Sequence, residues 1–580
     1  MARFIMLVAL LLTACGGSGT SVSDPPPNKS GSSAPSFGYT LSAAALTPAS
    51  VTAGNAASAA ITLTPTQGSG DTEAVTLSCK VVSGGVPSPA CSFKPSVVAL
   101  SGAAGGTSLL TVSSTSAVPG GPYSILVTAT DASGLAPSNG PQTLPLTIAA
   151  VIQHIVIIFQ ENRTPDNLFQ DPVLISRGAD IASSGKNSLG QVIALTPIDL
   201  GWSGPSPQNY DLAHEHGDFV IMYHYGKMDG ANWIACWTGK ATSCPANPQY
   251  KYVMPADVQP YFSLAEQYTF ADRMFQTNQG PSFPAHQFII SGTSAPTATS
   301  PLFASENPSI EGGCIAPANS VVPLINAQGG GEYSQPPMYP CFEHPTLTDL
   351  LETHGITWRY YTPTAGSIWT GPVAIQHICQ QQTIGGKLTC TGPEWTANVV
   401  IPQTKVLSDI ADGQLAQVTW IIPDGRYSDH AMVNDGSGPA WVASIVNAIG
   451  NSAYWSNTAI IITWDDWGGW YDHVAPTVVN DGSSWGSGYV YGFRVPLIFV
   501  SPYAKSAYIS HATHDFGSIL RFIEVTFGLP SLGYADTRAD ALADCYNLTQ
   551  APLTFHTIAA PLGPGHFIND TRPPVHPDDD

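Results

Sequence analysis

Two apolar runs that end abruptly in polar side chains constrain the fold of this chain more than any other feature. The first covers residues 154–159 and leads into Glu161, and the second covers residues 458–464 and leads into Asp465 and Asp466. Continuous β-branched runs are typical of parallel strands that are buried on both faces. Polar groups at the carboxyl ends of such strands mark where open α/β sheets bind ligands.

The polar groups at these two strand ends predict a metal site. Glu161, Asp465 and Asp466 would repel one another at one sheet edge unless a cation lay between them. Asn162 adds an amide oxygen, and such oxygen ligands suit one divalent cation, with Ca²⁺, Zn²⁺, Mg²⁺ and Mn²⁺ all open. Two adjacent Asp reach one ion only where a strand is ending, and the Gly468–Gly469 pair permits such a turn.

Ser282 is the candidate nucleophile, in the sequence Gly280-Pro281-Ser282-Phe283-Pro284 before the apolar run 288–290. If that run belongs to a helix, Ser282 lies at the helix N-terminus, where an alkoxide and a phosphate group both experience the positive helix end. A metal bound to the hydroxyl would lower its pKa. The alternative interpretation is a helix N-cap serine without a chemical role.

Two of the 15 histidines are singled out as candidate catalytic residues. His214 lies in a segment rich in His, Asp and Glu, and His430 follows the strand predicted over 417–422. A single histidine is more often structural than catalytic, and Arg163 is expected to be structural as well. His430 gains support because it also follows a strand's carboxyl end.

The chain divides into segments of different composition. Residues 151–580 alternate strand-like and helix-like runs, which predicts an α/β domain with a mainly parallel sheet flanked by helices. Further strands are predicted over 417–422 and 495–500. Helices are predicted over 347–353 and over 516–527, the latter ending at Gly528.

Residues 37–150 predict a different kind of structure. Short alternating runs rich in Thr, Ser and Gly recur there between turns, with almost no charge. This pattern is typical of a small all-β sandwich and resembles bacterial immunoglobulin-like modules. We expect a spacer, and polymer or carbohydrate binding is the alternative.

The N-terminus resembles a bacterial lipoprotein signal. An apolar stretch after Arg3 leads to Leu12-Thr13-Ala14-Cys15, so residues 1–15 are expected to be a signal peptide with Cys15 as the lipidated residue. Residues 16–36 then form a flexible tether. These features predict an exported bacterial lipoprotein, periplasmic or on the cell surface, anchored to a membrane by its lipid. Ordinary signal cleavage beside an incidental cysteine is the alternative.

Net charge and cysteine content limit the expected binding partners and the expected cellular compartment. The formal net charge of −21 disfavours binding to nucleic acids, so no nucleic-acid partner is expected. No C-x-x-C pair occurs, which weighs against a zinc site of cysteines, and an oxidising compartment favours disulfides. Proximity alone suggests four pairs and leaves Cys545 over: Cys79 with Cys91, Cys236 with Cys244, Cys314 with Cys341, and Cys379 with Cys390.

Several motifs occur in an order that resembles a known family. They span roughly residues 151–552 and are Glu161-Asn162-Arg163 with Asp166 and Phe169; Gly226-Lys227-Met228-Asp229-Gly230; Gly280-Pro281-Ser282 with Pro284; Ser428-Asp429-His430; Asp465-Asp466, Gly468-Gly469 and Asp472-His473-Val474; and Arg494-Val495-Pro496 with Ser501-Pro502. The chain resembles the bacterial phosphoesterase family of phospholipases C and acid phosphatases, within the alkaline phosphatase superfamily.

The resemblance implies an alkaline-phosphatase-like fold and a covalent phospho-enzyme route for hydrolysis of a phosphate ester, which a phospholipid could supply. Ser282 matches the nucleophile, and His214 and His430 match histidines that hold the phosphate or protonate the leaving oxygen. The metal-binding positions are matched by five residues, namely Glu161, Asn162, Ser282, Asp465 and Asp466.

The chain also departs from the family pattern. Ala285-His286 replaces the usual Asn-Arg after the nucleophile, so His286 is a candidate phosphate donor or simply fills space. His473 is a second candidate phosphate-binding residue. Residues 514–518 lack the central His of the family's Tyr-Asp-His-Thr-Ser, which puts a role for that loop in doubt. A surface binding or adhesion protein on a degenerate scaffold is the alternative to an enzyme.

Overall fold

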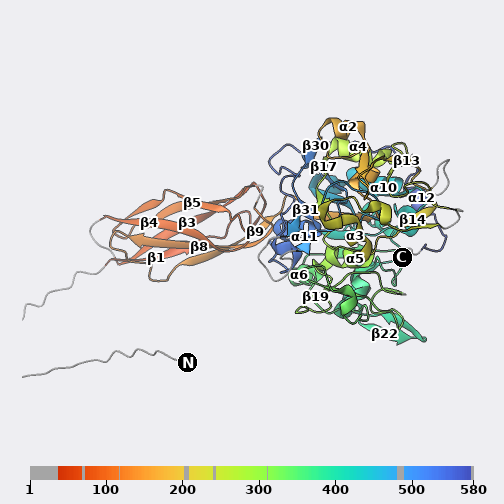
Figure 1. The fold of residues 1–580 in the computed structure, drawn as a ribbon. Coiled ribbons are helices and arrows are strands. Elements are labelled where there is room, and N and C mark those ends of the chain that lie inside the picture. The colour runs from red at the N-terminus through yellow and green to blue at the C-terminus, as the bar shows by residue number, and fades with distance from the viewer. Residues whose placement is uncertain are drawn as a thin grey trace, which may run out of the picture.

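The computed structural model describes residues 37–575, apart from 68–71, 116–117, 202–207, 239–242, 310 and 480–488. The expected signal peptide, Cys15 and the tether lie outside the described residues. Figure 1 shows an elongated N-terminal module of strands followed by a larger part that mixes strands and helices.

The N-terminal module consists of two β-sheets that share one core. The sheet orders are β1-β3-β7-β5 and β2-β9-β8-β4-β6. Burial alternates along strands such as β8, which packs one face inward, and the buried side chains of both sheets form one cluster. The strands are β1 Gly38–Ala43, β2 Ser50–Thr52, β3 Ala56–Gln67, β4 Thr72–Ser83, β5 Ala90–Lys94, β6 Val97–Ser101, β7 Gly106–Ser113, β8 Gly121–Asp131 and β9 Gln142–Ala149.

The larger part is built on a mixed sheet of eight strands in the order β24-β21-β25-β10-β26-β29-β17-β30. The bounds are β10 His154–Gln160, β17 Thr269–Ala271, β21 Trp358–Tyr361, β24 Val399–Val400, β25 Val418–Ile421, β26 Thr458–Trp464, β29 Leu497–Val500 and β30 Tyr508–Ser510. The predicted strands are present, but β29, expected in a mainly parallel sheet, runs antiparallel to both neighbours. A strand's own apolar pattern does not encode its direction.

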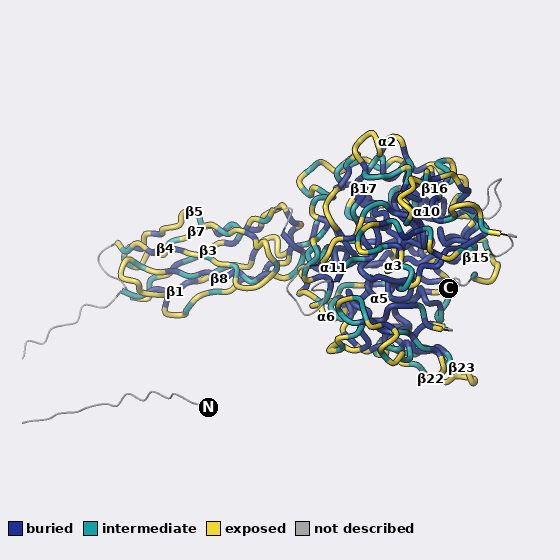
Figure 2. Tube along the Cα trace, in the orientation of Figure 1, coloured by how far each residue is buried: buried dark blue, intermediate teal, exposed yellow. Residues whose placement is uncertain are grey.

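Helices cover both faces of this sheet. Phe159 of β10 pairs in register with Thr463 of β26, so the next residue, Trp464, points to the opposite face. Phe159 contacts Phe516 of α11, whereas Trp464 contacts Tyr261 of α4, which places these two helices on opposite faces. The central strands β10 and β26 are therefore buried on both sides, and Figure 2 shows buried residues concentrated in the interior of the larger part.

The helix boundaries follow sequence signals where an amphipathic pattern is present. The predicted helices over 347–353 and 516–527 are α6 and α11, and Gly528 ends α11 in a left-handed conformation. The α-helices are α1 Pro165–Leu168, α2 Pro172–Ser176, α3 His216–Tyr223, α4 Gln259–Gln267, α5 Ser282–Ser291, α6 Leu347–Thr353, α7 Gln376–Cys379, α8 Pro393–Asn398, α9 Lys405–Ala411, α10 Gly438–Gly450, α11 Phe516–Phe527 and α12 Pro564–Ile568.

All four predicted disulfides are present, and Cys545 is a buried free thiol. Each bond closes a short loop, which is why proximity in sequence sufficed to predict the pairs. Among the described helices, none combines the length and apolarity needed to cross a bilayer.

Candidate active site

The sheet register brings the two predicted acidic strand ends together. Gln160 and Trp464 are paired partners at the ends of the parallel strands β10 and β26. Glu161 and Asp465 are the residues that follow, and the backbone N–H of Asp465 donates to the carbonyl of Gln160 over 3.0 Å. The prediction that these carboxylates share one sheet edge is confirmed.

A sharp turn after β26 directs both aspartates to this place. Asp465 Oδ1 accepts hydrogen bonds from the backbone N–H of Asn162 over 2.9 Å and of Asp466 over 2.7 Å. Gly468 donates to Asp466 Oδ1 over 2.7 Å. Gly468 and Gly469 have φ of +59° and +71°, and a Cβ on Gly468 would lie 2.6 Å from the carbonyl oxygen of Asn162. The turn therefore requires glycine, as predicted.

Ser282 is the first residue of α5, and its hydroxyl donates to Asp466 Oδ2 over 3.2 Å. Pro281 occupies the N-cap position, so the interpretation of Ser282 as an N-cap is wrong. The hydroxyl lies at the positive end of a fully buried helix. Ser282 is only 1% exposed, so it lies beneath the surface and not in the open cleft expected of a nucleophile.

Several polar atoms around Ser282 are buried without a hydrogen-bond partner. They are both carboxylate oxygens of Glu161, Oδ1 of Asn162, Oδ2 of Asp465 and both ring nitrogens of His286. His286 Nε2 lies 3.3 Å from Glu161 Oε1 and 4.0 Å from Asp465 Oδ2. Buried polar atoms normally have partners, so this concentration indicates a bound group that the protein atoms alone do not supply.

The electrostatics of these residues fit a divalent cation. Burial and the charge of Asp465 raise the pKa of Glu161 well above its ordinary value, because two buried carboxylates cannot both ionise without a balancing charge. Burial also lowers the pKa of His286 to about 4, which keeps its imidazole neutral and able to act as a ligand. Carboxylate, amide and imidazole donors together suit a borderline divalent ion.

His286 is therefore better placed to contact a cation than the sequence indicated. It was expected to contact phosphate or to fill space, but it lies among the carboxylates. Its spacing of four residues from Ser282 was the available signal, since residues i and i+4 share one face of a helix.

His214 orients the amide of Asn162. The Nδ1 atom of His214 lies 2.7 Å from the carbonyl of Leu212, which accepts only, so Nδ1 carries the proton. Its Nε2 then accepts from Asn162 Nδ2 over 2.8 Å. This contact fixes the amide so that its oxygen is turned away from His214 and remains available to a cation.

His430 lies beside His214, with 6.0 Å between the ring centroids. Its Nδ1 donates to the carbonyl of Ala431 over 2.8 Å and lies 3.7 Å from Asp211 Oδ2. The indole of Trp369 contacts His430 at 5.8 Å. The structure therefore brings together both histidines predicted as catalytic.

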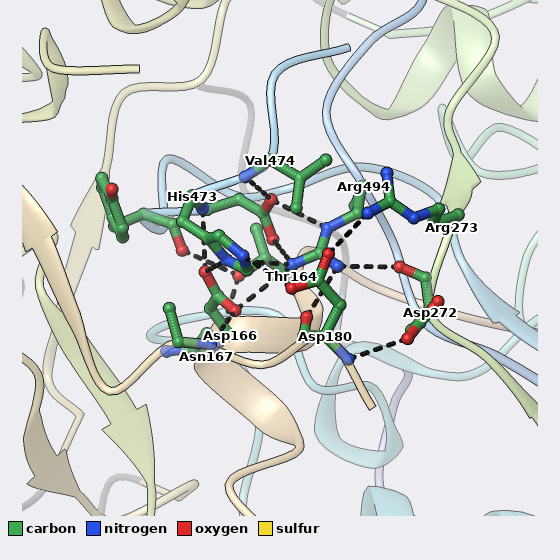
Figure 3. Close-up of polar contacts among 12 residues, drawn as sticks. Thr164, Asp166, Asn167, Asp180, Asp272, Arg273, His473, Val474 and Arg494 are labelled. Atoms are coloured by element: carbon green, nitrogen blue, oxygen red, sulfur yellow. Dashed lines mark hydrogen bonds and ion pairs between the residues drawn. The ribbon is translucent and has the colours of Figure 1, made fainter. Parts of the chain in front are cut away.

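His473 has different partners from the other predicted residues. Its Nδ1 lies 2.7 Å from Asp166 Oδ2 and its Nε2 lies 3.0 Å from Asp180 Oδ1 (Figure 3). Arg494 completes this cluster with a bidentate contact to Asp472 at 2.9 and 3.0 Å and a contact to Asp166 at 3.2 Å. Both ring nitrogens of His473 are thus engaged by carboxylates, which does not support its predicted role in binding phosphate.

Arg163 also contacts protein groups, in agreement with its expected structural role. Its guanidinium donates to the carbonyl of Asp429 over 2.9 Å, to Asn167 Oδ1 over 3.1 Å and to Gln208 Oε1 over 2.6 Å. The Asp429 carboxylate in turn accepts from Tyr261 and Trp464, both over 2.9 Å. This network holds the loop before His430 against the sheet.

A comparison with protein-family models identifies the family of this chain. The model of the Phosphoesterase family matches residues 152–530, which include every residue of the candidate active site, and the chain belongs to this family.

Individual relatives are more distant. The chain is 24% identical over 442 residues to the non-hemolytic phospholipase C of Pseudomonas aeruginosa. This alignment covers 69% of the present chain but only 57% of the length of that relative. It is 24% identical over 447 residues to phospholipase C B of Mycobacterium tuberculosis, covering 69% and 78%. A solved protein of the alkaline phosphatase superfamily from Vibrio parahaemolyticus aligns with 10% identity and a TM-score of 0.27, covering 67% and 70%.

Proposed function

We propose that this protein is a metal-dependent hydrolase of phosphate esters that acts through a phosphoserine at Ser282. The observation that carries the proposal is the group of unpartnered buried atoms of Glu161, Asn162 and Asp465 beside the Ser282 hydroxyl. Membership of the phosphoesterase family supports the same reaction class.

Five residues would hold the cation, namely Glu161, Asn162, Ser282, Asp465 and Asp466. When bound, it would neutralise charge on the phosphoryl group and favour ionisation of the serine hydroxyl. His286 is a further candidate ligand, since its Nε2 lies 3.3 Å from Glu161 Oε1.

The residues of the chain supply the remaining chemistry. The Ser282 proton passes to Asp466 Oδ2, which already accepts a hydrogen bond from that hydroxyl. A bond forms between Ser282 Oγ and phosphorus as the bond from phosphorus to the leaving oxygen breaks, and an imidazole, which we assign to His430, protonates that oxygen. Water then attacks the phosphoserine and gives a proton to the same imidazole, the bond between Ser282 Oγ and phosphorus breaks to release phosphate, and the proton held by Asp466 returns to Ser282 Oγ.

A phospholipid is the favoured substrate, and a phosphate monoester is the alternative. The relatives named above are phospholipases C, and their activity is proposed here for this chain. The segment that follows His214 also exposes a set of apolar side chains suited to acyl chains: Val220, Ile221, Tyr225, Trp233 and Trp237.

The test compares p-nitrophenylphosphorylcholine with p-nitrophenyl phosphate, each with and without chelator. We expect turnover of the diester, loss of turnover with chelator, recovery on adding a divalent metal, and a phosphoserine trapped at Ser282. Preference for the monoester would instead indicate a phosphatase. Turnover of neither substrate under metal repletion between pH 5 and 9 would favour a binding protein.

We further propose that residues 1–36 deliver and anchor the protein as an exported lipoprotein through Cys15. The two-sheet module would then be an immunoglobulin-like spacer between the membrane and the catalytic part. Labelling with a radioactive fatty acid, with Cys15→Ala as the control, tests the anchor.

A further inference from the structure

A second group of ligand-type side chains lies beside the segment that leads to Ser282. One ligand atom each from His216, Glu306 and Glu332 lies within 4.8 Å of the other two. His216 begins α3, Glu306 follows β19 (Leu302–Ala304), and Glu332 begins the 3-10 helix η3 (Glu332–Ser334). These three residues take no part in the reaction proposed above.

The tautomer of His216 is set by Gln279. The side-chain nitrogen of Gln279 donates to the carbonyl of Val490 over 2.6 Å, which directs its Oε1 toward His216 Nε2 at 3.3 Å. An amide oxygen accepts only, so Nε2 carries the proton. In a neutral His216 the lone pair therefore lies on Nδ1.

The two carboxylates are also held from one side. The Ser305 hydroxyl donates to Glu332 Oε1 over 2.6 Å, and the backbone N–H of His216 donates to Glu306 Oε1 over 2.8 Å. These two hydrogen bonds leave the Oε2 atom of each carboxylate available to a further partner. Outer hydrogen bonds of this kind orient ligands in metal sites.

The remaining atoms are electron-rich and face one another. His216 Nδ1 lies 3.0 Å from Glu332 Oε2. Glu306 is only 8% exposed, and its Oε2 is buried without a hydrogen-bond partner. A lone pair facing a carboxylate oxygen, beside a second buried carboxylate, is stable only with a cation or a proton between them.

Neighbouring carboxylates add to the negative charge around His216, Glu306 and Glu332. Beside Glu306 and Glu332, the start of α3 adds two more carboxylates, because Glu215 is its N-cap and Asp218 lies in its first turn. Within the part of the chain that the structure describes, no Lys or Arg forms an ion pair with these four carboxylates. A divalent cation would balance this charge locally.

We propose that His216, Glu306 and Glu332 bind a divalent cation of the Zn²⁺ class, at a site separate from the one at Glu161 and Asp465. One imidazole and two carboxylates are a ligand set found for such ions. The bound cation ties the start of α3, two residues after His214, to the β19 and η3 segments, and Gln279 connects it to the loop before Ser282. This role is structural and does not depend on the proposed hydrolysis.

Protons are the competing source of positive charge. A doubly protonated His216 beside a protonated Glu306 would satisfy the same contacts without a metal. Glu306→Gln distinguishes the two, because an amide replaces the hydrogen-bond donor of a carboxylic acid but is a weak ligand for Zn²⁺.

The full chain, stripped with chelator, is titrated with ZnCl₂ by calorimetry, and the bound zinc is counted after gel filtration. We expect Glu306→Gln and His216→Ala each to bind one equivalent fewer than the unmodified chain. The exposed neighbour Glu215 provides a matched control, and Glu215→Gln should keep the full number. Circular dichroism and Tm identify any variant that does not fold.

Asp465→Asn separates the two sites. This variant should lose the zinc ion bound at Glu161 and Asp465 and keep the one bound at Glu306. ZnCl₂ should therefore still raise the Tm of Asp465→Asn but not that of the Asp465→Asn/Glu306→Gln variant. Full zinc stoichiometry and affinity in Glu306→Gln would overturn the inference and leave the proposed function standing. If Glu306→Gln loses one equivalent of zinc and Asp465→Asn loses none, the inference stands and the metal site of the proposed function is contradicted.

Discussion

The side-chain amide of Asn162 donates to Nε2 of His214 over 2.8 Å, and this contact decides which way the amide oxygen points. Because His214 donates its Nδ1 proton to the carbonyl of Leu212, Nε2 must accept. The histidine therefore fixes a ligand of the proposed cation without needing to contact the ion.

His214→Ala should weaken metal binding as well as turnover. Loss of an outer partner of this kind typically costs about 10–100-fold in metal affinity or activity. Metal Kd by competition with a chelating dye and kcat/KM on the same samples measure the effect. The exposed His556→Ala is the control and should change neither quantity. Unchanged metal affinity in His214→Ala would assign His214 to the reaction alone.

Ser282→Ala and Asp465→Asn should separate chemistry from metal binding. Removal of the nucleophile should lower turnover by roughly 10³-fold or more while most of the metal affinity remains. Asp465→Asn should lower both, since its Oδ2 is one of the unpartnered atoms. Metal content and kcat of the two purified variants provide the comparison. Residual activity of Ser282→Ala near the original level would mean that another residue is the nucleophile.

Gly468→Ala should destabilise the protein and disturb the cation site together. A methyl group there would lie 2.6 Å from the carbonyl oxygen of Asn162, at a φ of +59°. Gly385 has the same φ but open space around it, so Gly385→Ala measures the backbone strain alone, about 1 kcal/mol. The contact at Gly468 should add about 1–3 kcal/mol. Thermal unfolding of both variants tests this difference, and equal Tm values would argue against the close approach.

His473 should make stability depend on pH. Burial lowers its pKa, but the hydrogen bond and charge of Asp166 outweigh this and raise the pKa to about 9. The ordinary value is about 6.5, so the protonated form is stabilised on folding. That contribution, about 1–3 kcal/mol, is fully present below pH 6.5 and is lost as pH rises through 9.

The matched measurement for this prediction uses His473→Gln, which remains neutral. Its Tm should lie furthest below that of the unmodified chain at pH 6, and the gap should narrow by pH 9.5. Parallel Tm curves across this range would show that His473 is not charged in the folded protein.

Parts of this fold could be predicted because the local pattern was strong. A continuous apolar run identified β10 and β26, and an amphipathic face with a glycine stop gave the bounds of α11. The three-residue strands β17 and β30 show no such periodicity, and their pairing depends on neighbours distant in sequence.

The site was predictable to a similar extent. Glu161 and Asp465 stand at strand ends, and their positions could be inferred from the sheet alone. The spacing of His286 from Ser282 indicates one shared helix face, but its contact with Glu161 depends on how α5 packs against the sheet, which the sequence does not show. Glu306 and Glu332 lie in irregular segments without a motif, so only the folded chain brings them to His216.

The pairing of Gln160 with Trp464 has a consequence for how this protein can evolve. Main-chain hydrogen bonds, and not the side chains along the strands, set the distance between Glu161 and Asp465, the residues that follow this pair. Apolar exchanges within either strand therefore leave the acidic pair opposite each other. Insertion or deletion of one residue would turn every later side chain of that strand to the other face. The apolar side chains of these two strands can therefore be exchanged during evolution, whereas the number of residues in each strand cannot change without separating Glu161 from Asp465.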